Sequence, residues 1–203
     1  MALGPGVVYV AYGRNACAEA TESICTLREH HDWPIAVVGD PIPDTQHIPW
    51  EGFGRPGRWA KVNLLELSPF ERTLYLDADT RVHGDLSTGF DILQDGWELV
   101  MVPSKRDELG AVGILVEDER NAMLVELGNC WPLMLNTGVM WFRKTPRTER
   151  LWQTWREEWL RFQEHDQGTL LRALGPTPVA LWLLGRPFNG GDVVEHLFGR
   201  ARA

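Results

Sequence analysis

Cysteine is scarce in this chain and follows no pattern. The three cysteines, Cys17, Cys25 and Cys130, contain no Cys-x-x-Cys pair of the kind that binds zinc. An odd number of cysteines without ligand spacing points away from a metal held by thiolates. We therefore expect all three to be buried thiols.

Long hydrophobic runs are also missing. No segment approaches the roughly 20 apolar residues that cross a bilayer. The first residues, MALGPGVVYVAYG, lack the basic start and the apolar length of a secretory signal. The sequence thus predicts a cytoplasmic protein without a membrane anchor.

Positive charge is limited. The net charge is −8, and the 20 basic residues comprise 17 arginines but only three lysines, Lys61, Lys105 and Lys144. This acidic balance argues against broad binding to nucleic acid, which requires a basic face. A local basic patch could still hold an acceptor, so a modified nucleobase stays among the open acceptor classes.

Motifs of several other enzyme classes are absent. The chain has no Gly-x-x-x-x-Gly-Lys-Ser/Thr phosphate loop and no Gly-x-Ser-x-Gly nucleophile elbow. It shows no internal repeat and no low-complexity linker, and 203 residues suffice for one domain with a good core. We therefore expect a single domain over residues 1–203.

What the chain does have is an alternation of short apolar runs and amphipathic segments. The runs predict strands at 6–11, 34–38, 73–76, 98–102, 139–142 and 178–184. Helices are predicted at 16–30, 58–66, 119–127, 146–162 and 166–174, and loops at 12–15 and 41–56. This order indicates an α/β fold with a mostly parallel sheet flanked by helices.

Two aspartates follow the strand predicted at 73–76. In an extended segment residues i and i+2 point the same way, so the carboxylates of Asp77 and Asp79 can converge on one small object. Two carboxylates at the carboxyl end of a buried strand need a positive partner, and Mg²⁺ or Mn²⁺ fits them. Asp-x-Asp alone equally opens a turn, so the surrounding sequence has to decide.

The surrounding sequence resembles a known family. LYLDADTRVHGDL, which contains both aspartates, is similar to the metal-binding segment of nucleotide-sugar glycosyltransferases with the Rossmann-like GT-A fold. The likeness is to the family 8-like, glycogenin- and galactosyltransferase-type branch. It implies that Asp79 is the principal ligand to metal and diphosphate, with Asp77 as a second ligand or a ribose contact.

Two later segments resemble the sugar-binding parts of the same family. Asn136-Thr137-Gly138 resembles a segment whose Asn amide contacts the donor sugar, although Asn and Gly also form turns. Asp166-Gln167 resembles a pair in which the Asp binds sugar hydroxyls and the Gln lies near the anomeric carbon. The alternative for Asp166 is a helix N-cap. The family often continues with a second Asp, where this chain has Gly168.

The last segment resembles the family's His-x-x-Gly-x-x-Lys pattern. It runs from His196 through Gly199 to Arg202, which stands in place of the Lys. The resemblance implies that His196 is the third protein ligand of the metal, and that Gly199 and Arg202 contact the diphosphate. Either basic side chain could stabilise a leaving phosphate.

Two further places are predicted to contact the donor. One is the carboxyl end of the first strand, where parallel sheets bind ligands; its residues are Ala11, Tyr12, Gly13 and Arg14. The other is Lys61, because the resemblance places a basic residue of the preceding helix near the nucleotide-sugar. A solvated helix face is the alternative for Lys61.

Together these features predict a metal-dependent glycosyltransferase of hexosyltransferase type. It would move a sugar from a nucleoside diphosphate sugar, UDP-linked, to an acceptor hydroxyl, and the resemblance implies retention of anomeric configuration. Two alternatives stay open: a nucleotidyltransferase that makes sugar nucleotides on the same architecture, and a nucleotide-sugar-binding module without catalysis. The sugar, the acceptor and the oligomeric state are not identified by the sequence.

Overall fold

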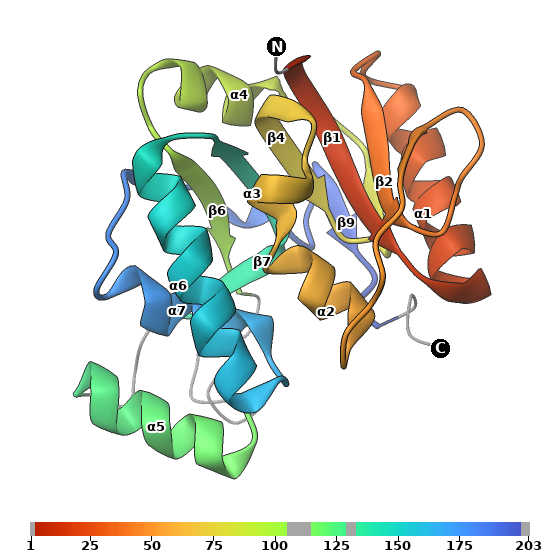
Figure 1. Cartoon of the computed structure of the whole chain (residues 1–203). Helices are drawn as coiled ribbons and strands as arrows, with labels where there is room; N and C mark the ends of the chain where they lie inside the picture. The colour runs from red at the N-terminus through yellow and green to blue at the C-terminus, as the bar shows by residue number, and fades with distance from the viewer. Residues whose placement is uncertain (1–2, 105–114, 129–132, 200–203) are drawn as a thin grey trace.

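The computed structural model describes residues 3–104, 115–128 and 133–199. They form one seven-stranded sheet, ordered β3-β2-β1-β4-β7-β6-β8, a small sheet of β5 and β9, and the helices around them (Figure 1). The strands are β1 (Leu3–Ala11), β2 (Ile35–Gly39), β3 (Gln46–Ile48), β4 (Phe70–Leu76), β5 (Thr80–Val82), β6 (Leu99–Pro103), β7 (Leu135–Arg143), β8 (Leu181–Leu183) and β9 (Val194–His196). The helices are α1 (Gly13–Arg28), α2 (Pro56–Lys61), α3 (Leu64–Leu67), α4 (Ser87–Gln94), α5 (Glu117–Leu127), α6 (Pro146–Phe162), α7 (Asp166–Leu174) and the 3-10 turn η2 (Arg186–Phe188).

Most neighbouring strands of the large sheet are parallel. β1 pairs in parallel with β2 and β4, β2 with β3, and β6 with β8, whereas β7 is antiparallel to β4 and β6. The carboxyl ends of β1, β2, β4 and β6 therefore share one edge of the sheet with the amino end of β7. This is the edge where open α/β sheets bind ligands. The predicted α/β class with a mostly parallel sheet is confirmed.

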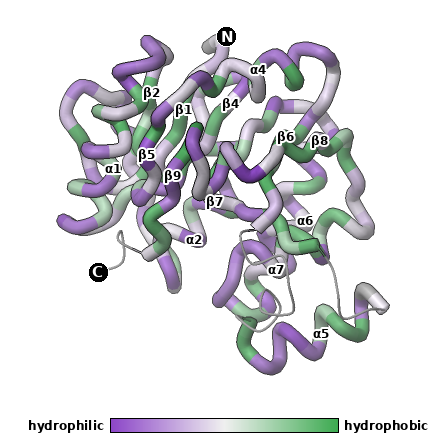
Figure 2. Tube along the Cα trace, turned by 180° about the vertical axis from the view of Figure 1, so that it is seen from behind, coloured by the Kyte–Doolittle hydropathy of each residue, from purple (hydrophilic) through white to green (hydrophobic). Residues whose placement is uncertain are grey.

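The two faces of the sheet are covered by different helices. Val8 and Val10 of β1 belong to the core cluster that packs under α2, α3, α6 and α7. Val7 and Tyr9, which alternate with them, pack with α1, α4 and the β5–β9 pair. Seen from behind, the green segments along β6 and β8 mark apolar strands within this arrangement (Figure 2). Apolar side chains at alternate strand positions thus pack against one layer of helices on each face of the sheet.

Several predicted boundaries differ from the structure. α1 already begins at Gly13, so the loop predicted at 12–15 is wrong except at Tyr12. The helix predicted at 58–66 is two short helices, α2 and α3, and β3 lies inside the loop predicted at 41–56. The strand predicted at 178–184 is only the three residues of β8. β3, β5 and β9 are three residues each, which is too short for a periodic apolar pattern.

The prediction of buried cysteines is wrong for the two that the structure describes. Cys17 is partly exposed and Cys25 is exposed, because the buried side of α1 is formed by Ala16, Ala20, Ser23 and Leu27 instead. Cys130 lies outside the described residues. Within the described parts of the chain, no helix has the length and apolar character needed to cross a membrane.

Candidate active site

The two aspartates occupy the turn between β4 and β5. Asp77 follows the last residue of β4, and Asp79 precedes the first residue of β5. The backbone N–H and the side-chain hydroxyl of Thr80 both donate to the carbonyl of Asp77, at 3.2 and 2.8 Å. The extended geometry assumed from the sequence is therefore wrong, because a tight turn joins the two residues. The carboxylates converge nevertheless, and the turn is what brings them together.

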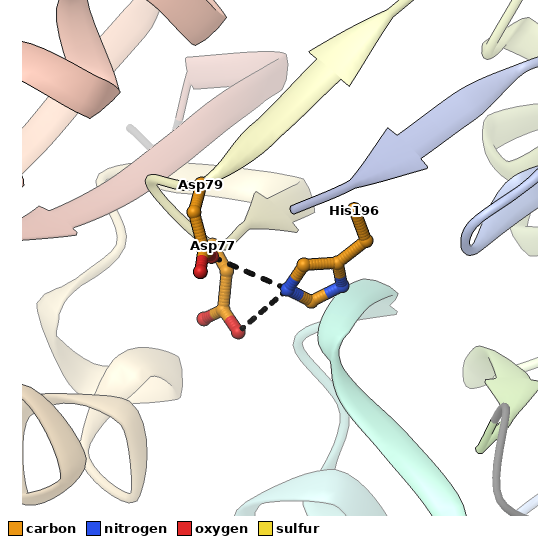
Figure 3. Close-up of side chains that lie close together, drawn as sticks. All are labelled: Asp77, Asp79 and His196. Atoms are coloured by element: carbon orange, nitrogen blue, oxygen red, sulfur yellow. Dashed lines mark ion pairs between the residues drawn. The ribbon is translucent and has the colours of Figure 1, made fainter. Parts of the chain in front are cut away.

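His196 reaches this turn through the small β5–β9 sheet. In that antiparallel pair Thr80 is the direct partner of His196, so a residue far along the chain is held next to Asp79. The Nε2 atom of His196 lies 3.2 Å from Asp79 Oδ1 and 3.7 Å from Asp77 Oδ2 (Figure 3). One ligand atom from each of the three side chains lies within 4.8 Å of the others. We call these three residues the Asp–Asp–His cluster.

Asp79 is the most tightly held member of the cluster. Only 6% of it is exposed, and burial by itself opposes its ionisation. His196 on one oxygen and the Gly199 N–H on the other, at 2.5 Å, outweigh that effect and lower the pKa of Asp79 to about 2. The Leu197 N–H also donates to the Asp79 carbonyl at 2.8 Å. Asp79 is therefore an ionised, immobilised ligand at neutral pH.

Asp77 divides its two oxygens between two tasks. Oδ1 accepts a hydrogen bond from the Tyr75 hydroxyl at 2.6 Å and lies 2.9 Å from Lys61 Nζ. Oδ2 faces His196. Gly138 of β7 packs against this side, where a Cβ atom would come within 2.4 Å of Oδ2 and 2.5 Å of His196 Cε1. A residue larger than glycine at position 138 would therefore press into the cluster.

The cluster fits a hard divalent cation. Ligands at right angles around Mg²⁺ or Mn²⁺, with bonds of roughly 2.1 Å, are about 3 Å apart, and the separations of 3.2 and 3.7 Å around His196 Nε2 are close to this. Two carboxylate oxygens and one imidazole nitrogen are donors that such an ion accepts. Glycine at position 138 lets Asp77 and His196 keep these positions, since a Cβ there would displace both. Asp77, Asp79 and His196 are thus the residues that could hold a metal.

Lys61 joins the cluster to a second carboxylate. It is 7% exposed, and its Nζ lies 2.9 Å from Asp77 Oδ1 and 3.0 Å from Asp166 Oδ2. Burial would lower the pKa of Lys61, but Asp166 and Asp77 together raise it above its usual value. The alternative of a solvated helix face is wrong for this residue, which is a buried cation between two anions.

Asp166 is the first residue of α7 and faces back toward the sheet. Its Oδ2 accepts a hydrogen bond from Thr137 Oγ1 at 2.6 Å, and its Oδ1 lies 3.8 Å from Arg58 Nε. Burial opposes ionisation, yet Lys61 and then Arg58 hold the pKa of Asp166 well below its usual range. The N-cap alternative is wrong, since His165 occupies the N-cap position. Gln167 follows in the first turn of α7 and is half-buried.

Asn136, Thr137 and Gly138 lie inside β7, not in a turn before it. A β-bulge interrupts the pairing of β7 with β6 at this point, since Met101 pairs with Met140 while Val102 pairs with Asn136. The bulge sets the segment against the aspartate turn, where Asp77 N–H donates to the Gly138 carbonyl at 2.7 Å. Asn136 is buried and accepts a hydrogen bond from the Gly138 N–H at 2.8 Å.

The residues predicted to contact the nucleotide begin at the end of β1, the strand next to β4 in the sheet. Val8 of β1 pairs with Tyr75 of β4, so the ends of these strands, Ala11 and Asp77, share the ligand-binding edge of the sheet. Ala11 is buried, Tyr12 is half-buried, and Gly13 and Arg14 are exposed at the start of α1. The Gly13 N–H donates to Asp40 Oδ2 at 2.7 Å. The structure therefore places the four residues beside the cluster without showing a ligand contact.

The tail is described as far as Gly199. Gly199 has a positive φ of 96°, a conformation that favours glycine, and this brings its N–H onto Asp79. Arg202, predicted to contact the diphosphate, lies outside the described residues.

Sequence reasoning missed three side chains that build the site. Tyr75 and Thr137 hold Asp77 and Asp166, and Asn189 holds His196 Nδ1 at 2.9 Å. Tyr75 lies in β4, two residues before Asp77, which directly follows that strand, so strand alternation could have indicated it. Thr137 lies within Asn136-Thr137-Gly138, but a role was predicted only for Asn136. Asn189 offered no signal beyond its place in a Gly-rich stretch.

We compared the chain with protein families, curated proteins and solved structures. No protein-family model matches the chain, and a search of curated proteins also finds no match. Solved structures do match. The galactosyltransferase LgtC, in complex with donor and acceptor sugar analogues, superposes with a TM-score of 0.59 at 15% identity, over 91% of this chain and 74% of that chain.

Two further solved structures are similar. The glycosyltransferase GlyE of Streptococcus pneumoniae TIGR4 gives a TM-score of 0.58 at 16% identity and covers 90% of this chain, which spans only 45% of GlyE. A glycosyltransferase involved in glycosylating the major capsid of PBCV-1 gives 0.56 at 12% identity, over 97% of this chain and 96% of that chain. At such identities the likeness concerns the fold alone, and the fold of this chain is that of the GT-A glycosyltransferases.

Proposed function

We propose that this chain is a metal-dependent glycosyltransferase. It transfers a hexose from a UDP-linked sugar to an acceptor hydroxyl, with retention of configuration, as the resemblance to the family 8-like branch implies. The observation that carries the proposal is the Asp–Asp–His cluster at the ligand-binding edge of a GT-A sheet, next to the buried Lys61–Asp166 pair. We expect the reaction to take place in the cytoplasm.

Each residue of the site has a part in this proposal. A divalent ion, Mn²⁺ or Mg²⁺, held by the Asp–Asp–His cluster would supply positive charge that stabilises the leaving diphosphate. Asp79, which is ionised and fixed by the Gly199 N–H, and His196 would hold that ion. Asp77 offers it Oδ2, because Oδ1 is already engaged by Tyr75 and Lys61.

The sugar would lie on the Asp166 side of Lys61. Asp166 Oδ2 is engaged by Lys61 and Thr137, while Oδ1 is beyond hydrogen-bonding distance of Arg58 Nε, at 3.8 Å. We therefore assign Oδ1 to a sugar hydroxyl. Gln167 in the same helical turn is assigned to the acceptor side of the anomeric carbon, and the Asn136 amide to a further sugar hydroxyl.

The nucleotide would extend toward β1 and the tail. Ala11, Tyr12, Gly13 and Arg14 are assigned to the nucleoside, since they share the sheet edge with Asp77. Gly199 and Arg202 are assigned to the diphosphate. A cation that stabilises a leaving phosphate acts on the transition state, which is the part proposed for Arg202.

The test is a product analysis with a panel of donors. The purified chain is incubated with Mn²⁺ and UDP-, GDP-, dTDP- or ADP-linked hexoses, with a mixture of simple glycosides as acceptors, and the products are identified by mass spectrometry and NMR. We expect UDP and a new glycoside with the anomeric configuration of the donor, and no product in the presence of EDTA.

Other results would decide against the proposal. Release of pyrophosphate in a parallel incubation with UTP and a hexose 1-phosphate would identify a nucleotidyltransferase. Donor binding by calorimetry, without hydrolysis or transfer to any acceptor, would identify a binding module. An inverted anomeric configuration would contradict the proposed retention while leaving the transferase activity in place.

A further inference from the structure

Both ring nitrogens and one face of the His196 ring are in contact with other groups. Nε2 faces the two aspartates, and the other ring nitrogen points away from them (Figure 3). That other nitrogen, Nδ1, lies 2.9 Å from Asn189 Oδ1. One face of the ring stacks on Phe198, with ring centroids 4.0 Å apart and an angle of 17° between the planes. The imidazole therefore has little freedom to turn.

The contact with Asn189 determines which ring nitrogen carries hydrogen. An amide oxygen can only accept a hydrogen bond, so Nδ1 must donate to it. In a neutral imidazole, Nε2 is then the nitrogen with the free lone pair. This lone pair faces carboxylate oxygens at 3.2 and 3.7 Å. Nε2 can carry a hydrogen toward these oxygens, as in the contact that lowers the pKa of Asp79, or it can offer its lone pair to a cation placed among the three groups.

The burial of Asn189 carries a cost. Asn189 is 2% exposed, and its Nδ2 atom has no hydrogen-bond partner among the described residues. A buried amide nitrogen without a partner costs about 1–3 kcal/mol. An apolar side chain would avoid this cost but would leave the Nδ1 of His196 without its acceptor, so what the asparagine supplies here is the oxygen that faces the ring.

The backbone around Asn189 is built to hold it in place. The Asn189 N–H donates to the Arg186 carbonyl at 2.9 Å, and Gly190 N–H donates to the Val194 carbonyl at 2.7 Å. Gly190 has a positive φ of 84°, and a Cβ on Gly191 would come within 2.7 Å of Pro187 Cα. The two glycines thus permit a tight reversal between η2 and β9. This reversal sets Asn189 opposite His196, seven residues later.

We propose that Asn189 is a positioning residue for the metal site. By accepting a hydrogen bond from Nδ1, it selects the tautomer of His196 whose Nε2 lone pair points between Asp77 and Asp79, and it holds the ring in that orientation. The proposal rests on the metal site of the proposed function. It adds that metal affinity depends on a residue that does not touch the ion.

The test compares Mn²⁺ binding in three variants, measured by the loss of the free Mn²⁺ signal in electron paramagnetic resonance. Asn189→Leu keeps the branching at Cγ and the number of side-chain heavy atoms but removes the acceptor, and we expect affinity to fall about 10- to 100-fold. Asn189→Asp keeps the acceptor, and we expect affinity at least equal to that of the original chain. Thr148→Val, at a buried hydroxyl of the α6 capping box, is the control for general destabilisation and should bind Mn²⁺ normally.

A second measurement is made on the original chain, and a variant serves only to assign the signal. With ¹⁵N-labelled histidine and Mg²⁺ in place of Mn²⁺, the His196 ring, assigned by its loss in His196→Gln, should show hydrogen on Nδ1 and none on Nε2. Hydrogen on Nε2 in the Mg²⁺-loaded protein would overturn the proposal, as would unchanged Mn²⁺ affinity in folded Asn189→Leu. If the original chain binds neither ion, the metal site of the proposed function fails together with this inference.

Discussion

Lys61 balances the charge of the candidate site. Its ammonium group lies within 3.0 Å of one oxygen of Asp77 and one of Asp166, and it sits over the ring of Tyr75, 5.2 Å from the centroid. Both carboxylates belong to the part of the site where the sugar and the metal are proposed to meet. Removing the cation would leave two negative groups facing each other in a poorly hydrated place.

Lys61→Met should therefore destabilise the fold and abolish transfer. We expect the free energy of unfolding in urea to fall by roughly 3 kcal/mol, the cost of breaking a buried ion pair from one side. Asp166→Asn added to Lys61→Met should recover part of the loss, with a coupling of about 1–3 kcal/mol.

The matched control is Lys144→Met. Lys144 is half-buried and donates to the Ser68 carbonyl at 2.6 Å, so its loss should cost only about 1 kcal/mol, the value of one hydrogen bond. Equal losses at positions 61 and 144, or strict additivity of the double variant, would refute the role of Lys61 as a bridge.

Single residues were predictable where a segment resembled a known family. Asp77, Asp79 and His196 lie together as the resemblance of their segments implied, although the residue type alone did not place His196 beside the aspartates. The reason given for the convergence of the aspartates was wrong, because a turn and not an extended strand joins them. The sequence could not show that position 138 has to be glycine. Only the packed structure shows that a Cβ there would clash with Asp77 and His196.

At the scale of elements, α5 explains a departure from the family pattern. Gly168 of α7 stands where the family that the sequence resembles often has a second Asp. A Cβ at this position would come within 2.9 Å of Glu119 Oε1 and 3.0 Å of Leu115 Cδ2. Glu119 is buried and lies 3.4 Å from Arg172 of α7, and its burial raises the pKa of its carboxyl. The close packing of α5 and Leu115 thus leaves little room for a side chain at position 168.

Gly168→Asp should consequently be destabilising. It adds atoms to a packed contact and sets a second carboxylate against Glu119, so we expect a loss of more than about 2 kcal/mol in chemical denaturation. Gly168→Asp combined with Glu119→Ala should lose less than the sum of the two single changes, by about 1–3 kcal/mol.

Gly4→Ala is the control for adding a side chain. Nothing lies within 4 Å of a Cβ at that position, so the change should be nearly neutral. If Gly168→Asp is as stable as Gly4→Ala, then α5 does not pack against α7 as the structure has it.

Long elements were predictable and short ones were not. α6 and α7 have the predicted bounds, 146–162 and 166–174, because their apolar periodicity is sustained over several turns. Asn136-Thr137-Gly138 kept the turn alternative open because of its residue types, but pairing with β4 and β6 places it within β7. Such pairing depends on residues far apart in the sequence, so local residue preferences do not predict it.

At the scale of the whole molecule, the sheet gathers distant segments at one edge. The carboxyl ends of β1 and β4, the amino end of β7, the start of α7 and the end of β9 all lie there. The sequence order of the motifs indicated the fold, since each resembled part of one architecture. The three-residue strands β5 and β9, which connect His196 to the aspartates, carried no signal of their own.

The most direct test of the central claim is the melting temperature of the chain with Mn²⁺ alone, with UDP alone and with both. We expect the rise with both at saturating concentration to exceed the sum of the rises with each alone by about 5 °C or more, because UDP is proposed to bind through the ion held by the Asp–Asp–His cluster. Asp79→Asn should abolish that rise, while Asp91→Asn, at an exposed position of α4, should leave it intact. A rise in Asp79→Asn equal to that of the original chain would contradict the account.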